Sequence, residues 1–154
     1  MDWLVEIKSS DDHLSFDAGQ INMPIQDIHP SKLYYIAGTL TREEIQKSID
    51  LLFKDPLTEK EKIYKMSDIE KMKENPVNTE ADRWEVEVFY KKEVTDPATS
   101  YILKALNDIS IKADNVRTGY RYVIKGKLNL ENVKLFARRY LANLIVQDMY
   151  IKSL

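Results

Sequence analysis

An internal repeat at a fixed offset is the feature that most constrains how this chain folds. When Gly38 is aligned with Gly126, the sequence keeps the same register over about twenty positions. Because a repeat uses one supersecondary unit twice, we expect two similar modules. The aligned pairs are Tyr35/Val123, Ile36/Ile124, Leu40/Leu128, Glu43/Glu131, Ile45/Val133, Ile49/Ala137, Leu52/Tyr140, Phe53/Leu141 and Asp55/Asn143.

Each copy of the repeat predicts a helix with a defined start and one apolar face. Thr41 and Glu44 have the spacing of a capping box, and Pro56 ends this first helix. Asn129 is the expected N-cap in the second copy. The apolar positions recur at helical spacing. They are Ile45, Ile49, Leu52 and Phe53 in the first copy, and Val133, Phe136, Ala137, Tyr140, Leu141 and Leu144 in the second.

Residues 84–151 carry the fuller pattern. Alternating apolar and acidic residues predict a strand over 84–92. Asp96, followed by Pro97, predicts the N-cap of a helix that runs to about Ile109. Two extended segments follow within 115–128, and the capped helix then leads to a closing strand over 145–151. The expected order is therefore strand, helix, strand, strand, helix, strand.

The first half reads as a shorter version of this pattern. Strands are expected over 3–7 and, after a turn at Pro30 and Ser31, over 32–38. Trp3 and Trp84 both open a first strand, but their offset is seven residues shorter than that of the aligned glycines. The residues that form the first helix of the second half therefore have no counterpart.

Residues 61–83 predict a linker between the two halves. This segment is rich in lysine and glutamate. Ile63, Met66, Ile69 and Met72 recur every three residues, which favours a short surface helix within it.

The composition argues against several kinds of site. The absence of cysteine excludes disulfides and thiolate ligands and fits a reducing cytoplasm. No apolar run approaches the ~20 residues of a membrane span, and Met1 leads into a strand-like segment rather than a secretory leader. Four glycines form no phosphate loop, and His13 and His29 lack ligand spacing. We therefore expect no catalytic residue, no cofactor and no metal site.

Charge is unevenly distributed along the chain. The net charge of −2 argues against general binding to nucleic acid or anionic membranes. Residues 1–60 hold six basic and eleven acidic side chains, a net charge of −5, whereas residues 84–154 hold twelve and eight, a net charge of +4. These opposite charges would attract the two parts if they pack together.

Residues 117–125, RTGYRYVIK, support an alternative function. Gly119, Tyr120 and Tyr122 fit part of the RNP1 pattern of RNA-recognition domains. Arg121 stands where that pattern has a small residue, and Lys125 stands where it has an aromatic one. RNA binding through the two tyrosines thus remains an alternative. A second alternative is a ferredoxin-like module that binds a small regulatory ligand.

Four short motifs in residues 84–151 occur in the order seen in one known family. They are Val94-Thr95-Asp96-Pro97, then Val116-Arg117 with Gly119, then Leu141-Ala142-Asn143, and the strand that follows from Ile145 to Tyr150. In these motifs the segment resembles PurS, the small subunit of phosphoribosylformylglycinamidine (FGAM) synthase. It departs from the family at Ala98-Thr99, where glycine is frequent nearby, and at Leu144, where proline or threonine is common.

The resemblance implies a fold of the α+β class. It predicts two PurS-like modules of ferredoxin-like βαββαβ order, packed as an intrachain pseudo-dimer. Residues 1–60 would be the degenerate module and residues 84–154 the better-preserved one, joined by the linker 61–83.

The resemblance also implies a non-catalytic role. PurS-like subunits bridge a PurL-like synthetase subunit and a PurQ-like glutaminase subunit, which together convert FGAR to FGAM with ATP and ammonia from glutamine. Carried over at motif positions, the candidate interface residues are Asp96, Arg117, Arg121 and Asn143, although Asp96 and Asn143 also suit helix caps. The expected state is a cytoplasmic monomer with an internal pseudo-dimer, or a dimer.

Overall fold

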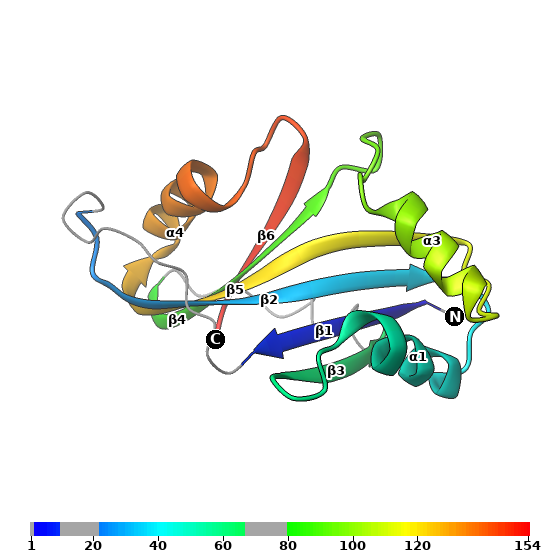
Figure 1. Ribbon diagram of the computed structural model, residues 1–154. Helices are drawn as coiled ribbons and strands as arrows, with labels where there is room; N and C mark the ends of the chain where they lie inside the picture. The colour runs from blue at the N-terminus through cyan, green and yellow to red at the C-terminus, as the bar shows by residue number, and fades with distance from the viewer. Residues whose placement is uncertain (1, 10–21, 67–79) are drawn as a thin grey trace. The chain divides into compact units, whose positions relative to one another are not determined.

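The computed structural model describes residues 2–9, 22–66 and 80–154, which form an α+β protein. Six strands form an antiparallel sheet in the order β3-β1-β2-β5-β4-β6 (Figure 1). This confirms the predicted fold class and is compatible with a ferredoxin-like fold. The strands are β1 (Trp3–Ser9), β2 (Ile25–Ala37), β3 (Glu59–Lys65), β4 (Glu80–Tyr90), β5 (Asn115–Asn129) and β6 (Gln147–Ser153). The helices are α1 (Arg42–Ser48), α3 (Thr99–Asp108) and α4 (Leu130–Phe136).

The chain divides into two compact units, and each unit draws on both halves of the sequence. Unit 1 comprises residues 1–10, 32–75 and 95–118, and unit 2 comprises residues 11–31, 76–94 and 119–154. Both long strands are divided between the units: β2 after Ser31 and β5 after Thr118. Helix α3, which belongs to the second half of the sequence, is therefore part of unit 1.

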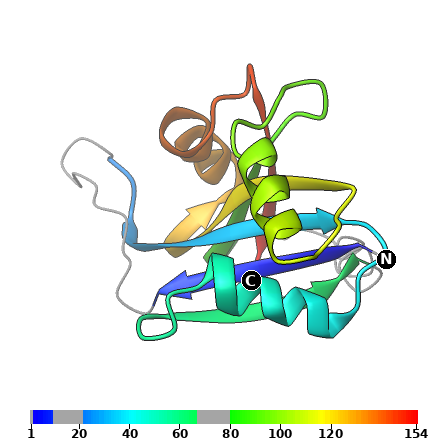
Figure 2. The same cartoon turned by 45° about the vertical axis from the view of Figure 1, so that its right-hand side comes forward.

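Unit 1 has a core of aliphatic and aromatic residues between its strands and two helices. Trp3, Val5 and Ile7 share one face of β1 and are all buried, as predicted, although Leu4 and Glu6 on the other face are buried as well. They pack with Ile45 of α1 and Leu106 of α3 in one cluster. Figures 1 and 2 show both helices lying on this unit's strands. Burial of a whole aliphatic side chain stabilises a fold by about 1.5–3 kcal/mol, so this cluster fixes both helices.

Unit 2 has a separate core of the same kind. The alternating residues Trp84, Val86 and Val88 of β4 are buried. Phe136 and Val133 of α4 complete this cluster. The indole N–H of Trp84 donates to the backbone oxygen of Ala81 at 3.1 Å, which satisfies the one polar group of this buried ring.

Both helix starts predicted for the two copies of the repeat are confirmed. The Thr41 hydroxyl accepts a hydrogen bond from the backbone N–H of Glu44, and the Glu44 carboxylate accepts one from the backbone N–H of Thr41. In the second copy the Asn129 side chain accepts from the backbone N–H of Asn132 at 2.8 Å. These local caps satisfy donors that the first turn leaves without intrahelical partners.

The predicted apolar stripes are wrong in the last turn of each helix. α1 continues into a π-helical turn over Ile49–Phe53, and α4 into one over Ala137–Leu141. A π turn adds a residue per hydrogen-bonded ring, so positions spaced for an α-helix rotate away from the core. Leu52 and Tyr140 are exposed in consequence, whereas Phe53 remains buried. Leu144 is exposed because it lies in the turn beyond the end of this helix at Leu141.

Four other expectations about local structure are corrected. Pro30 and Ser31, where a turn was expected, lie inside β2. Residues 32–36 of the same strand pair with β1. The two extended segments expected within 115–128 form the single strand β5, because pairing with β4 continues from Gly119 to Asn129. The described ends of the expected linker are strand: β3 pairs with β1, and β4 begins at Glu80. The closing strand begins at Gln147 rather than at residue 145.

Two expectations lie outside the described residues. The first is the lack of a counterpart to the first helix between the strand over 3–7 and the strand over 32–38, where residues 10–21 are not described. The second is the middle of the linker, residues 67–79.

Three consecutive elements of the first sequence half have counterparts with the same bounds at an offset of 88 residues. The bounds of α1, its π turn and β3, shifted by this offset, are those of α4, its π turn and β6. The strand register repeats as well. Trp3 pairs with Ile36 and Lys65, whereas Trp84 pairs with Ile124 and Ser153.

The aligned glycines Gly38 and Gly126 are also alike in structure. Their φ angles are +145° and +156°, in a region that side chains disfavour. A Cβ at Gly126 would collide with the backbone oxygen of Pro24, and a Cβ at Gly38 would lie 3.2 Å from the backbone nitrogen of Asp114. At Gly126 both the φ angle and the lack of space for a Cβ require glycine. At Gly38 the φ angle is the main reason.

We expect Gly126→Ala to destabilise the protein more than Gly38→Ala. The first change combines φ strain with a backbone collision and should cost about 2–4 kcal/mol, whereas the second should cost about 1–2 kcal/mol. Denaturant unfolding of both variants measures the difference. Lys125→Ala, an exposed change in β5, serves as the control. Equal, small losses for both glycine variants would contradict the expectation.

Candidate partner-binding surfaces

The four predicted interface residues lie in different local settings. Asp96 and Arg117 belong to unit 1, and Arg121 and Asn143 belong to unit 2. Asp96 is buried, Arg117 and Arg121 are half-buried, and Asn143 is exposed. No measurement assigns any of them to a partner, so their interface role stays a prediction.

Asp96 joins the loop before α3 to strand β5. Its carboxylate accepts hydrogen bonds from the backbone N–H of Ala98 at 2.9 Å, from the backbone N–H of Thr118 at 2.6 Å and from the Thr118 hydroxyl at 2.9 Å. Asp96 is therefore not the N-cap that the sequence predicted. Helix α3 begins at Thr99, its N-cap is Ala98, and Ala98 makes no side-chain hydrogen bond. The Asp96 side chain holds Thr118, 22 residues away, instead of a helix end.

Arg121 lies in a cross-strand ion-pair cluster. It pairs directly with Glu87 of β4 in the sheet register. Its Nη2 lies 2.6 Å from Glu87 Oε1, and its Nε lies 3.3 Å from Glu85 Oε1. The three side chains are mostly shielded from solvent, so this cluster fixes the outer face of the β4–β5 ladder.

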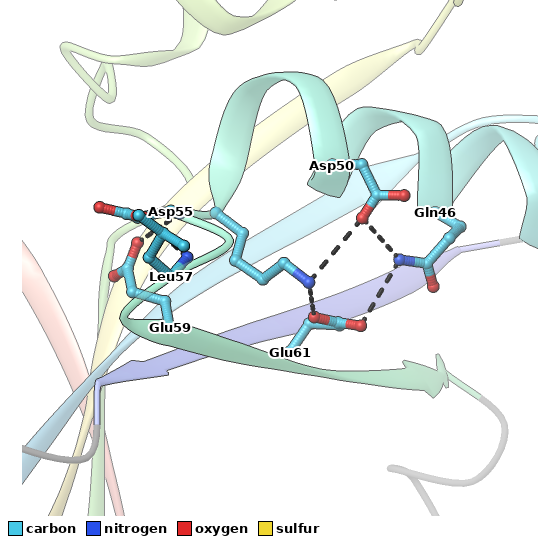
Figure 3. Close-up of polar contacts among 7 residues, drawn as sticks. Gln46, Asp50, Asp55, Leu57, Glu59 and Glu61 are labelled. Atoms are coloured by element: carbon cyan, nitrogen blue, oxygen red, sulfur yellow. Dashed lines mark hydrogen bonds and ion pairs between the residues drawn. The ribbon is translucent and has the colours of Figure 1, made fainter.

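Asn143 organises the turn between α4 and β6. Its side-chain oxygen accepts from the backbone N–H of Ile145 at 3.1 Å, and its backbone N–H donates to the Gln147 side chain at 2.8 Å. Asp55 makes the same two bonds in the first copy, with Leu57 at 2.9 Å and Glu59 at 2.9 Å (Figure 3). Each turn thereby presents one large apolar side chain to solvent: Leu57 is 92% exposed and Ile145 is 83% exposed.

The first turn has a polar cluster beside it that the sequence patterns did not predict. The Lys54 ammonium donates to Glu61 at 2.6 Å and lies 3.8 Å from Asp50. Gln46 donates to Asp50 at 3.0 Å and approaches Glu61, so the group links α1 and its π turn to β3 (Figure 3). Pairing with Lys54 lowers the pKa of Glu61, and the same pair raises the pKa of Lys54. The sequence analysis missed this cluster because it placed Glu61 in the linker instead of in a strand beside the helix.

The two tyrosines of the RNP1-like pattern contact each other. Their rings stack with centroids 6.0 Å apart, Tyr120 being exposed and Tyr122 half-buried. Burial raises the pKa of the Tyr122 hydroxyl, and the neighbouring Tyr120 adds to this effect. RNA binding through this pair stays a prediction.

Within residues 2–9, 22–66 and 80–154 no group of acidic or histidine side chains is arranged to hold a metal ion. Unit 2 has an open, polar pocket of about 520 Å³ beside the start of α4, and unit 1 has one of about 410 Å³ beside the start of α1. Their linings combine amide, carboxylate and lysine side chains, with two hydroxyl groups, those of Thr39 and Ser110, in the smaller pocket. No helix in the described part of the chain is long and apolar enough to cross a membrane.

Comparison with known families agrees with the motif order in the second half of the chain. The model of the PurS family, described as phosphoribosylformylglycinamidine (FGAM) synthase, matches residues 83–154. Residues 83–154 are PurS-like. This confirms the resemblance drawn from Asp96, Arg117 and Asn143, and it links this part of the chain to FGAM synthase and to purine biosynthesis. No curated protein matched the chain.

The PurS-like segment includes parts of both units. It contains α3 and the start of β5 in unit 1, and the rest of β5, α4 and β6 in unit 2. The match therefore covers structure beyond one compact unit.

We expect Asp96→Ala to destabilise the protein by about 2–3 kcal/mol, because it leaves two backbone N–H groups without their charged acceptor. Asp96→Asn should cost less, since the amide oxygen still accepts. Asp108→Ala, at an exposed position of α3, is the control. Chemical unfolding of the three variants measures the free energies. A loss at Asp96 no larger than at Asp108 would contradict this role.

We expect Glu61 to make stability depend on pH in the acidic range. Its folded pKa lies below the usual 4.5, so its contribution is present above that value and is lost as the pH falls through the folded pKa. Glu61→Gln should therefore lose less stability than the wild type between about pH 6 and about pH 3. Denaturant midpoints across this range measure it, with Glu43→Gln as the control. Parallel curves for Glu61→Gln and wild type would contradict it.

Proposed function

We propose that this chain is a non-catalytic subunit of FGAM synthase that bridges the PurL-like synthetase and the PurQ-like glutaminase during conversion of FGAR to FGAM. The PurS match over residues 83–154 carries this proposal. The described residues present hydrogen-bonded turns and ion pairs rather than an assembled nucleophile or metal site. Such a surface suits a binding role. A cytoplasmic location follows from this pathway.

We further propose that the chain is a tandem PurS-like duplication. The modules would be residues 1–60 and 84–154, joined by residues 61–83, and they would form a pseudo-dimer within one chain. The offset of 88 residues supports this proposal, because it relates helix bounds, π turns, the bounds of β3 and β6, and glycine φ angles together. Chance similarity of two strand–helix segments would not repeat so many independent features.

Sharing of elements between the units also fits a pseudo-dimer. α3 follows β4 in sequence, yet its Leu106 lies in the core with Trp3 and Ile45. Exchange of an element between modules is a common route by which two copies become one stable assembly. We therefore expect the isolated chain to be a monomer of 18.0 kDa.

We expect the full chain to co-elute with both subunits in gel filtration when glutamine and adenine nucleotide are present. Complexes with each subunit alone would identify the two contacts separately. Light scattering of the isolated chain tests the monomer in the same experiment. The bridging role is wrong if the chain elutes apart from both subunits under all nucleotide and glutamine conditions.

A further inference from the structure

Strand β6 stands at one end of the sheet order, and β4 is the only described strand that pairs with it. Its seven residues pair with β4 in an unbroken register, from Gln147 opposite Tyr90 to Ser153 opposite Trp84. The strand contains no proline, no glycine and no bulge. A regular edge strand presents a row of backbone N–H and C=O groups to another strand unless charge, proline or a bulge blocks it. The backbone of β6 is therefore suited to accept a further strand.

Strand β3, at the other end of the order, is protected by charge. Five of its seven residues are glutamate or lysine, whereas β6 has two charged residues, Asp148 and Lys152. Lysine side chains along an edge oppose the approach of a second strand. The two strands are equivalent at the offset of 88 residues, so Lys62 of β3 has the position of Tyr150 in β6. The repeat thus has one protected edge and one edge without this protection.

The sequence of β6 is complementary to itself when a second copy of the strand runs antiparallel to it. A twofold axis at Tyr150 keeps the side chains of both copies on matching faces of a joined sheet, because the paired positions then differ by an even number of residues. Opposite charges, apolar residues and polar residues meet in this register. The pairs are Asp148 with Lys152, Met149 with Ile151, Gln147 with Ser153, and Tyr150 with its own copy.

Only this register forms the two ion pairs. An axis at Met149 would place Asp148 opposite Tyr150, and an axis at Ile151 would place Lys152 opposite Tyr150. Within the described part of the chain neither Asp148 nor Lys152 forms an ion pair. Lys152 faces Glu85 in the sheet register, but Glu85 lies 3.3 Å from the Arg121 guanidinium. Both charges of β6 are therefore available to a second copy.

The apolar residues of β6 extend the core of unit 2 to the edge of the sheet. Met149 and Ile151 are half-buried and pack against the cluster that contains Trp84 and Val86. A second copy in this register covers the rest of each side chain with the other. Apolar pairs and opposite-charge pairs directly across an antiparallel ladder are both stabilising.

We infer that β6 pairs with β6 of a second copy of this chain, antiparallel and centred on Tyr150, so that the two sheets join edge to edge. The contact is isologous, because each copy contributes the same strand. A single strand pair is a small interface, so its dissociation constant is on the order of 100 µM. The isolated chain is thus a monomer at low micromolar concentration and a dimer well above this constant. The inference rests on β6 alone and not on the proposed function.

The first test exchanges the two charges of β6. Asp148→Lys and Lys152→Asp each place like charges opposite one another twice and should weaken the dimer about tenfold or more. The double variant restores opposite charges and should return to within about threefold of wild type. Sedimentation equilibrium from about 10 µM to about 1 mM measures each constant. Lys62→Asp makes the same charge change as Lys152→Asp on the exposed edge of β3 and should stay within about twofold of wild type.

A mixture of the two single variants keeps the inference testable if the double variant fails to fold. One chain then carries lysine at both positions and the other carries aspartate at both, so every charged pair is again opposite in sign. The equimolar mixture should associate about as tightly as wild type, although each variant alone does not.

The second test locates the twofold axis with a thiol, because the chain has no cysteine of its own. Tyr150→Cys places two thiols directly opposite each other, where antiparallel partners have Cα atoms about 4.5–5.5 Å apart, a distance that permits a disulfide. Diamide should convert this variant to a covalent dimer, observed by intact mass. Lys62→Cys, at the equivalent position of β3, should remain mostly monomeric.

The inference is overturned if the wild-type chain stays monomeric at about 1 mM. It is equally overturned if the single charge variants associate as tightly as wild type, or if neither the double variant nor the mixture restores association. Crosslinking of Lys62→Cys as fast as Tyr150→Cys would assign the contact to β3 or to random collision. All of these measurements use the isolated chain, so their failure leaves the bridging role unaffected.

Discussion

The structure depends on two long strands that each supply residues to both cores. β2 contributes Ile28 to the core of unit 2 and Ile36 to that of unit 1. β5 contributes Val116 to unit 1 and Ile124 to unit 2. Neither strand can be removed without opening both cores, and the loss of one buried aliphatic side chain already costs several kcal/mol. The two halves of the sequence are thus coupled through backbone that they share.

The features predicted correctly from sequence are those determined by neighbouring residues. Thr41 caps the helix that contains its partner Glu44, and Asn129 does the same three residues before Asn132. In β4 the buried residues Trp84, Val86 and Val88 alternate with half-buried ones along the strand. Such patterns are local, so a single sequence contains the information needed to identify them.

The failures arise where a distant partner or a change of helical period decides the structure. Asp96 looks like a cap until Thr118 is placed beside it, 22 residues away. Leu52 and Tyr140 fit an α-helical stripe, but a π turn moves both outward. Ile63 has the spacing of a helix, yet pairing with Val5 of β1 makes it strand. The polar cluster around Lys54 was missed for a further reason: Glu61 reaches Lys54 only because β3 lies beside the π turn that follows α1.

The repeated backbone carries different side chains at its two equivalent turns. In a dimer of identical subunits, symmetry makes equivalent faces chemically identical. Within a single chain, positions 88 residues apart can change independently while the backbone bonds that fix the turn are kept. Asp55 and Asn143 retain the same hydrogen bonds, although Lys54 and Ala142 beside them differ in charge. The same turn geometry is therefore kept beside two different sets of charged side chains.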